Sequence, residues 1–110
     1  MTRNSRLDTK YPALWTFFAG YMYQCWHDEF PDEWALADAF VREEPLSAST
    51  FRAEMDDLLS CYPDEDHLRG VLLDDFGAAA MVENRGWKYR DWLQALSDHV
   101  ARATGHPQAS

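Results

Sequence analysis

Side chains that could bind a metal or transfer a proton are most concentrated at residues 26–33, which read Trp-His-Asp-Glu-Phe-Pro-Asp-Glu. One histidine and four carboxylates within eight positions are the residue types that bind metal ions or form acid–base pairs. His27, Asp28 and Glu29 are consecutive, however, so on a helix their side chains point about 100° apart and cannot converge on one ion. The spacing therefore argues against a metal site in this stretch.

The other candidate catalytic residues are isolated from one another. His67, His99 and His106 are scattered, and no His-x-x-x-His, Glu-x-x-His or Cys-x-x-Cys spacing occurs. Cys25 falls in an apolar helical row and fits a small core residue better than a nucleophile. No glycine-rich phosphate loop is present. We therefore predict that the chain is not an enzyme and uses no metal or cofactor. An enzyme with paired carboxylates is the alternative, and it would need a convergent pocket with raised pKa values.

The pattern aromatic-Pro-Asp-Glu occurs twice, at residues 30–33 and at residues 62–65. Both copies lie where a helix is expected to begin, and free backbone N–H groups and the helix dipole favour carboxylates there. Capping explains the Asp-Glu pairs of both copies without any further role. It explains Asp28, Glu29 and Asp66 less well, so the surplus negative charge indicates a surface for a partner.

The elements that position these groups are helices, because helical periodicity dominates and strand alternation is nearly absent. The pattern predicts an all-α fold, a compact single-domain bundle of about five mostly antiparallel helices. The expected helices cover residues 12–26, 32–44, 49–62, 64–76 and 89–104, with a loop at 77–87. Residues 11–104 would form the domain, 1–10 a polar segment and 105–110 a flexible tail. The residues expected to share the core are Trp15, Phe18, Trp26, Met55, Leu59, Trp92 and Leu96.

Charge is distributed unevenly along the 110 residues, whose formal net charge is −9. Residues 28–84 hold sixteen acids and three bases, whereas both flanking segments carry more bases than acids. Such a middle segment repels phosphate, so direct nucleic-acid binding is not expected, and it attracts a basic protein. The alternative is that the acids only aid solubility. The chain lacks an apolar run of about 20 residues and a secretory signal, so we predict a cytoplasmic protein without a membrane partner.

The two acidic clusters would merge if the helices ran up and down with short connections. The loops after the first and third helices would then lie at the same end of the bundle. The resulting first choice for a partner-facing patch is Asp28, Glu29, Asp32, Glu33, Asp64, Glu65 and Asp66. The reserve choice is Asp56, Asp57, Asp74 and Asp75.

Two motifs resemble a known family. The aromatic-rich first helix carries Gly20, Tyr21, Gln24 and Trp26, and after an acidic turn the second helix ends with Phe40, Glu43 and Glu44. The last helix opens with Tyr89, Arg90, Asp91, Trp92 and Leu93. Over about residues 11–100 the chain resembles immunity proteins of bacterial contact-dependent growth inhibition systems. It departs from that pattern at Cys25, where the family is expected to carry an acid.

The resemblance implies a cytoplasmic immunity protein that binds and neutralises the toxin domain of a contact-delivered effector. Many such toxins are nucleases, often acting on transfer RNA, and a groove that binds RNA is basic. The acidic patch would then face the toxin, and the chain would need no small-molecule substrate. The alternative partner is another basic, nucleic-acid-binding protein, which the chain would regulate as an acidic helical module.

Overall fold

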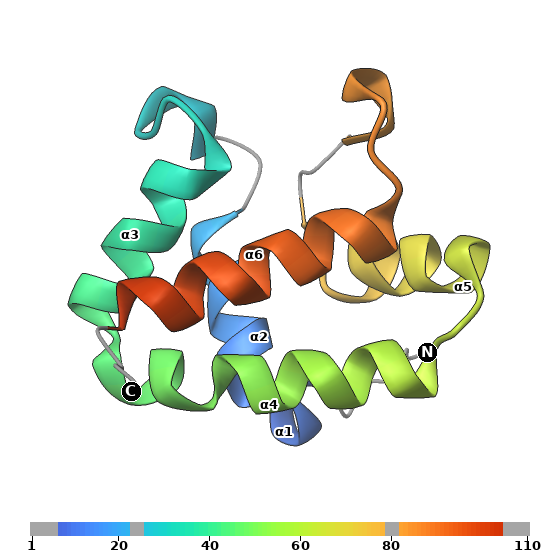
Figure 1. Ribbon diagram of the computed structural model, residues 1–110, viewed down its shortest axis with the longest axis horizontal. Helices are drawn as coiled ribbons and strands as arrows, with labels where there is room; N and C mark the ends of the chain where they lie inside the picture. The colour runs from blue at the N-terminus through green and yellow to red at the C-terminus, as the bar shows by residue number, and fades with distance from the viewer. Residues whose placement is uncertain (1–6, 23–25, 79–81, 105–110) are drawn as a thin grey trace.

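The computed structural model describes residues 7–22, 26–78 and 82–104, and within these ranges the chain is helical and contains no strand (Figure 1). Five longer helical segments form its body, which confirms the all-α prediction. They are α2 (Pro12–Trp15) continuing as η1 (Thr16–Tyr21), α3 (Glu33–Glu43), α4 (Pro45–Cys61), α5 (Glu65–Gly70) continuing as η3 (Val71–Asp75), and α6 (Tyr89–Ala103). The shorter turns are α1 (Leu7–Lys10), η2 (Trp26–Asp28) and η4 (Val82–Arg85).

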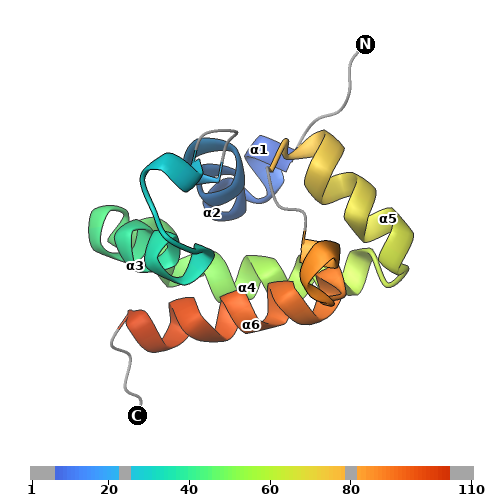
Figure 2. The ribbon, with the colours of Figure 1, turned by 90° about the horizontal axis from the view of Figure 1, so that it is seen from above.

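The two longest helices, α4 and α6, lie side by side and run in opposite directions (Figures 1 and 2). Helix α2 packs on α4, while α3 and α5 contact α6. Figure 2 shows α3 and α5 toward opposite ends of the α4–α6 pair. This arrangement decides which acidic segments become neighbours, because α3 and α5 each begin with one of the aromatic-Pro-Asp-Glu motifs.

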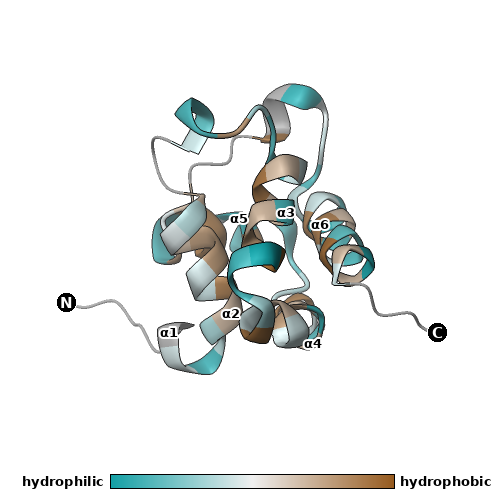
Figure 3. Ribbon diagram, turned by 90° about the vertical axis from the view of Figure 1, so that its left-hand side faces the viewer, coloured by the Kyte–Doolittle hydropathy of each residue, from teal (hydrophilic) through white to brown (hydrophobic). Residues whose placement is uncertain are grey.

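The core is rich in aromatic rings that meet edge to face. Phe17 lies 5.0–5.2 Å, between ring centroids, from Phe18, Phe40 and Phe51. Such pairs add about 0.5–1.5 kcal/mol each to the stabilisation from burial alone. All seven residues predicted for the core belong to it, with Trp15 partly buried at its edge. Figure 3 shows the hydrophobic residues gathered where α2, α3 and α6 face one another.

The first helix is shorter than predicted. It changes from α to π geometry at Thr16 and ends at Tyr21, whereas the apolar pattern predicts a helix to Trp26. Trp26 instead begins the separate turn η2, where its side chain is 4% exposed and stacks on His27. Periodicity alone does not reveal this break because the residues on both sides are apolar and buried. Cys25 and Gln24 lie outside the described residues.

Helix α4 begins four residues before its predicted start because Pro45 acts as its first residue. Proline ends the preceding helix, as predicted, but its fixed φ also suits the first turn of the next one. Glu44 therefore lies between α3 and α4 without a linker. Ser47 and Ser49, whose residue type favours a helix cap, instead lie inside α4, and the Ser49 hydroxyl donates to the Leu46 carbonyl. Gly77 follows η3 with φ of 71°, as expected for a glycine that ends a helix.

Candidate partner-binding surface

Glu33 is not a surface charge, and its assignment to the partner-facing patch is wrong. Its side chain is 1% exposed and lies between α3, η4 and α6. Both guanidinium ends of Arg85 donate to its carboxylate, at 2.7 and 3.3 Å. The indole Nε1 of Trp92 donates to the same carboxylate at 2.7 Å. Burial raises the pKa of Glu33, but the hydrogen bonds from Arg85 and Trp92 outweigh it and hold the pKa below 4.5.

Both helix-start aspartates act as the predicted caps. Asp32 accepts a hydrogen bond from the backbone N–H of Ala35 at 2.9 Å, and Asp64 accepts one from that of His67 at 2.9 Å. Each bond satisfies a backbone donor that has no partner within its own helix. Both aspartates remain exposed, so capping does not exclude them from a binding surface.

Two glutamates cap helices to which they do not belong. Glu65 at the start of α5 accepts the backbone N–H groups of Tyr89 and Arg90, the first two residues of α6. Glu54 within α4 does the same for Ala13 and Leu14 of α2. Sequence reasoning missed these long-range caps. The available signal was that Lys88 and Tyr11, which precede α6 and α2, are poor capping residues.

Removal of the Glu65 carboxylate should destabilise the fold. We expect Glu65→Ala to lower the free energy of unfolding by about 1–2 kcal/mol, since α6 loses its cap. Asp66→Ala is the matched control, because Asp66 is exposed and contacts no described residue through a hydrogen bond or ion pair. The control should change stability by less than about 0.5 kcal/mol. Urea denaturation of both variants measures the difference, and equal midpoints would contradict this role for Glu65.

The remaining candidate acids differ in whether they already form a hydrogen bond or ion pair within the fold. Asp57 accepts a hydrogen bond from the hydroxyl of Tyr11 at 2.6 Å. Burial of Tyr11, together with this bond, raises the pKa of the phenol. The exposed candidates without a hydrogen bond or ion pair to the described part of the chain are Asp28, Asp56, Asp66, Asp74 and Asp75. These five carboxylates are accessible to a partner.

The two acidic clusters do not form one patch. Figures 1 and 2 show η2 and the start of α3 on one side of the molecule and α5 on the opposite side. The expectation of a merged patch assumed an up-and-down bundle. Glu33 of α3 and Glu65 of α5 both bond to the first turn of α6, yet the two helices lie on different sides of it, so their acidic starts stay apart.

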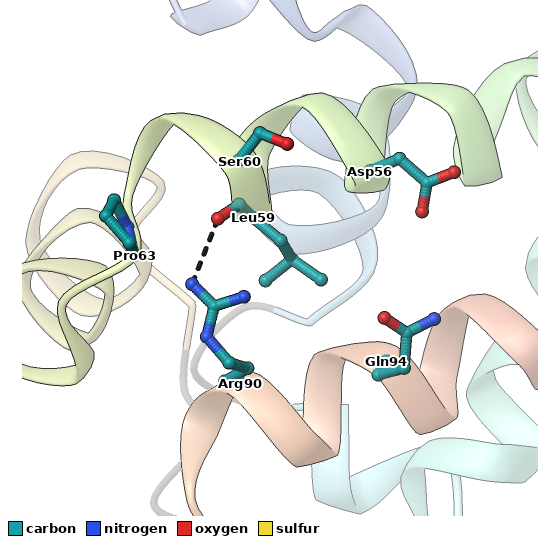
Figure 4. Close-up of a pocket in the computed structure, with 6 residues that line it drawn as sticks. All are labelled: Asp56, Leu59, Ser60, Pro63, Arg90 and Gln94. Carbon is teal, nitrogen blue, oxygen red and sulfur yellow. Dashed lines mark hydrogen bonds between the residues drawn. The ribbon is translucent and has the colours of Figure 1, made fainter.

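A groove of about 460 Å³ lies between α4 and α6 and is lined by residues of both helices and of the turn after α4 (Figure 4). Its lining residues are Asp56, Leu59, Ser60, Pro63, Arg90 and Gln94. The Arg90 guanidinium donates to the carbonyls of Leu59 and Tyr62, at 2.9 and 2.8 Å. Arg90 thereby satisfies carbonyls at the C-terminal end of α4, where cations are favoured.

A second hollow, of about 280 Å³, lies between Trp34 of α3, Trp87 and the outer face of α6. His99 in its wall contacts the Asp38 carboxylate at 2.8 Å, and Asp98 pairs with Arg52 at 3.0 Å. Within the described ranges no group of three His, Cys, Asp or Glu side chains is arranged to hold a metal ion. The same ranges contain no helix with the length and apolarity needed to cross a membrane.

Comparison with known families identifies the chain. The family model described as CdiI immunity protein matches residues 10–100, so the chain belongs to the CdiI immunity protein family. This membership confirms the resemblance and indicates neutralisation of a cognate toxin. No curated protein and no solved structure gives a significant match.

The family-like motif at the start of α6 has a structural role in this chain. Tyr89 and Trp92 are buried, Trp92 holds Glu33, and Arg90 satisfies the end of α4. Asp91, by contrast, is exposed. The motif residues that point inward therefore maintain the fold.

Proposed function

We propose that the chain is the inhibitor of a contact-delivered nuclease toxin, which it binds in the cytoplasm of the cell that makes both proteins. The observation that carries this proposal is the family match over residues 10–100. The proposed role is binding rather than catalysis, and it requires no cofactor, no membrane and no direct contact with nucleic acid.

The charge distribution supports a nuclease as the target. A nuclease that acts on RNA needs a basic groove, because phosphate contacts supply much of its affinity. The chain has a net charge of −9, and Asp28, Asp66, Asp74 and Asp75 are exposed without a hydrogen bond or ion pair to a described residue. An acidic inhibitor meets such a groove with complementary charge, which raises the association rate and opposes binding of the RNA.

Co-expression tests this function. The toxin domain encoded directly upstream of the gene for this chain is induced in a bacterium with and without the chain. We expect growth to be arrested by the toxin alone and restored when the chain is present, with a complex of the two proteins in the lysate. A toxin from an unrelated effector is the control and should remain active. Failure to restore growth against the upstream toxin would reject the proposed function.

A further inference from the structure

We propose that the α4–α6 groove is the anchor site of the toxin interface and receives a lysine or arginine side chain from the toxin. The inference rests on the proposed function and specifies where, and by what chemistry, the partner is held. The groove is open to solvent along α4 and α6, and its volume of about 460 Å³ leaves room for a long side chain of a partner.

The groove offers hydrogen-bond acceptors on both walls. Asp56 and Ser60 stand one turn apart on α4, and Gln94 stands on α6 (Figure 4). The carboxylate of Asp56 and the amide of Gln94 face each other across the groove. None of the three side chains has a hydrogen bond or ion pair to the described part of the chain. The groove therefore presents polar groups that the fold itself does not use.

Arg90, the cation that lines the groove, does not prevent a second cation from binding there. Its guanidinium keeps its positive charge, but it is held by the carbonyls of Leu59 and Tyr62 at the Pro63 end of the groove, whereas Asp56 and Gln94 lie toward the other end (Figure 4). These carbonyls lie at the negative end of the α4 dipole. Beyond Pro63 the chain continues into the acidic first turn of α5, where Asp64 and Asp66 are both exposed.

A long basic side chain fits these surroundings better than the alternatives. Its methylene stem can lie along Leu59 and Pro63 while its charged end donates to Asp56 and Gln94. An acidic side chain would be repelled by Asp56. An apolar side chain would remove water from the Asp56 carboxylate and give it no partner, which is unfavourable. Because the expected toxin surface is basic, lysine and arginine are also the side chains it would supply.

Binding of the purified upstream toxin domain to Asp56→Asn and Gln94→Ala variants tests the proposal. We expect Asp56→Asn to raise the Kd about 30-fold, as for loss of one partner of an enclosed charge pair, and Gln94→Ala to raise it about fivefold. Asp28→Asn is the matched control, because it removes the same charge from an exposed acid of η2 that has no hydrogen bond or ion pair to a described residue, and η2 lies on another side of the molecule. The control should change the Kd less than threefold.

Thermal melts of the free variants should stay close to that of the wild type, because neither Asp56 nor Gln94 has a hydrogen bond or ion pair to a described residue. If wild type binds the toxin and Asp56→Asn binds as tightly as Asp28→Asn, the groove is not the anchor, and the proposed function still stands. If the wild-type chain does not bind the upstream toxin at all, the proposed function fails and this inference fails with it.

Discussion

Glu33→Ala is expected to lower the free energy of unfolding by about 3 kcal/mol. Loss of one partner from a buried ion pair typically costs about 3–5 kcal/mol, because the other partner is left without compensation. The lower end applies here, since Arg85 is half exposed and can regain water. The indole N–H of Trp92 is buried and cannot be hydrated, so it would lose the acceptor that it contacts at 2.7 Å without gaining another.

Two controls separate this effect from ordinary losses of charge. Asp32→Ala removes only a helix cap and should cost about 1 kcal/mol, while Asp28→Ala should cost less than about 0.5 kcal/mol. Urea denaturation of the three variants provides the comparison. A Glu33→Ala variant as stable as Asp28→Ala would mean that the buried network contributes nothing to the fold.

The pH dependence of the same contact follows from the lowered pKa of Glu33. A carboxylate whose pKa is lower in the folded chain contributes stability above its unfolded value. That contribution is complete above pH 4.5 and is lost as the pH falls through the lower, folded-state pKa. The stability gap between wild type and Glu33→Gln should therefore be constant near neutral pH and narrow in acid below pH 4.5.

The second large effect is expected on toxin association. The double reversal of Asp56 and Asp66 to Lys should slow association by about 100-fold at low salt, because steering by complementary charge changes on-rates by about 10–10³. The fold should persist, since neither carboxylate has a hydrogen bond or ion pair to a described residue.

Reversal of Asp74 and Asp75 to Lys is the matched control for that variant. It changes the net charge by the same amount at two acids that are likewise exposed and have no hydrogen bond or ion pair to a described residue. We expect this second variant to slow association by less than about tenfold, because it alters the overall field but leaves Asp56 in the α4–α6 groove unchanged. Stopped-flow kinetics measures the association rate of both variants with the toxin. Equal slowing would mean that net charge, and not the groove, governs the encounter.

The helices and their aspartate caps could be predicted because both depend on nearby residues. Apolar positions three and four residues apart mark a buried helix face, and an Asp before a helix reaches a backbone N–H only three residues away. Asp32 and Asp64 illustrate the second rule. The predicted start of α4 is four residues too late, because a proline is compatible both with the end of one helix and with the first turn of the next, and Pro45 does both.

The position of the acids in space could not be predicted, because it depends on contacts between distant parts of the chain. Glu33 is 59 residues from Trp92 and 52 from Arg85, and no local pattern couples them. An Asp-Glu pair at a helix start reads as two surface charges, yet Asp32 faces water and Glu33 faces the core. Likewise, the packing of α3 and α5 along α6, which separates the two acidic clusters, is not encoded in the helix boundaries.

The proposed inhibition is tested by the affinity of the purified chain for the toxin domain encoded upstream, measured at two salt concentrations. We expect a saturable complex whose affinity falls markedly as the ionic strength rises, since exposed charges attract less when they are screened. Catalysis by the toxin should stop as the complex saturates. Absence of a saturable complex would contradict the assigned role, and a tight complex indifferent to salt would contradict an interface built on acidic residues.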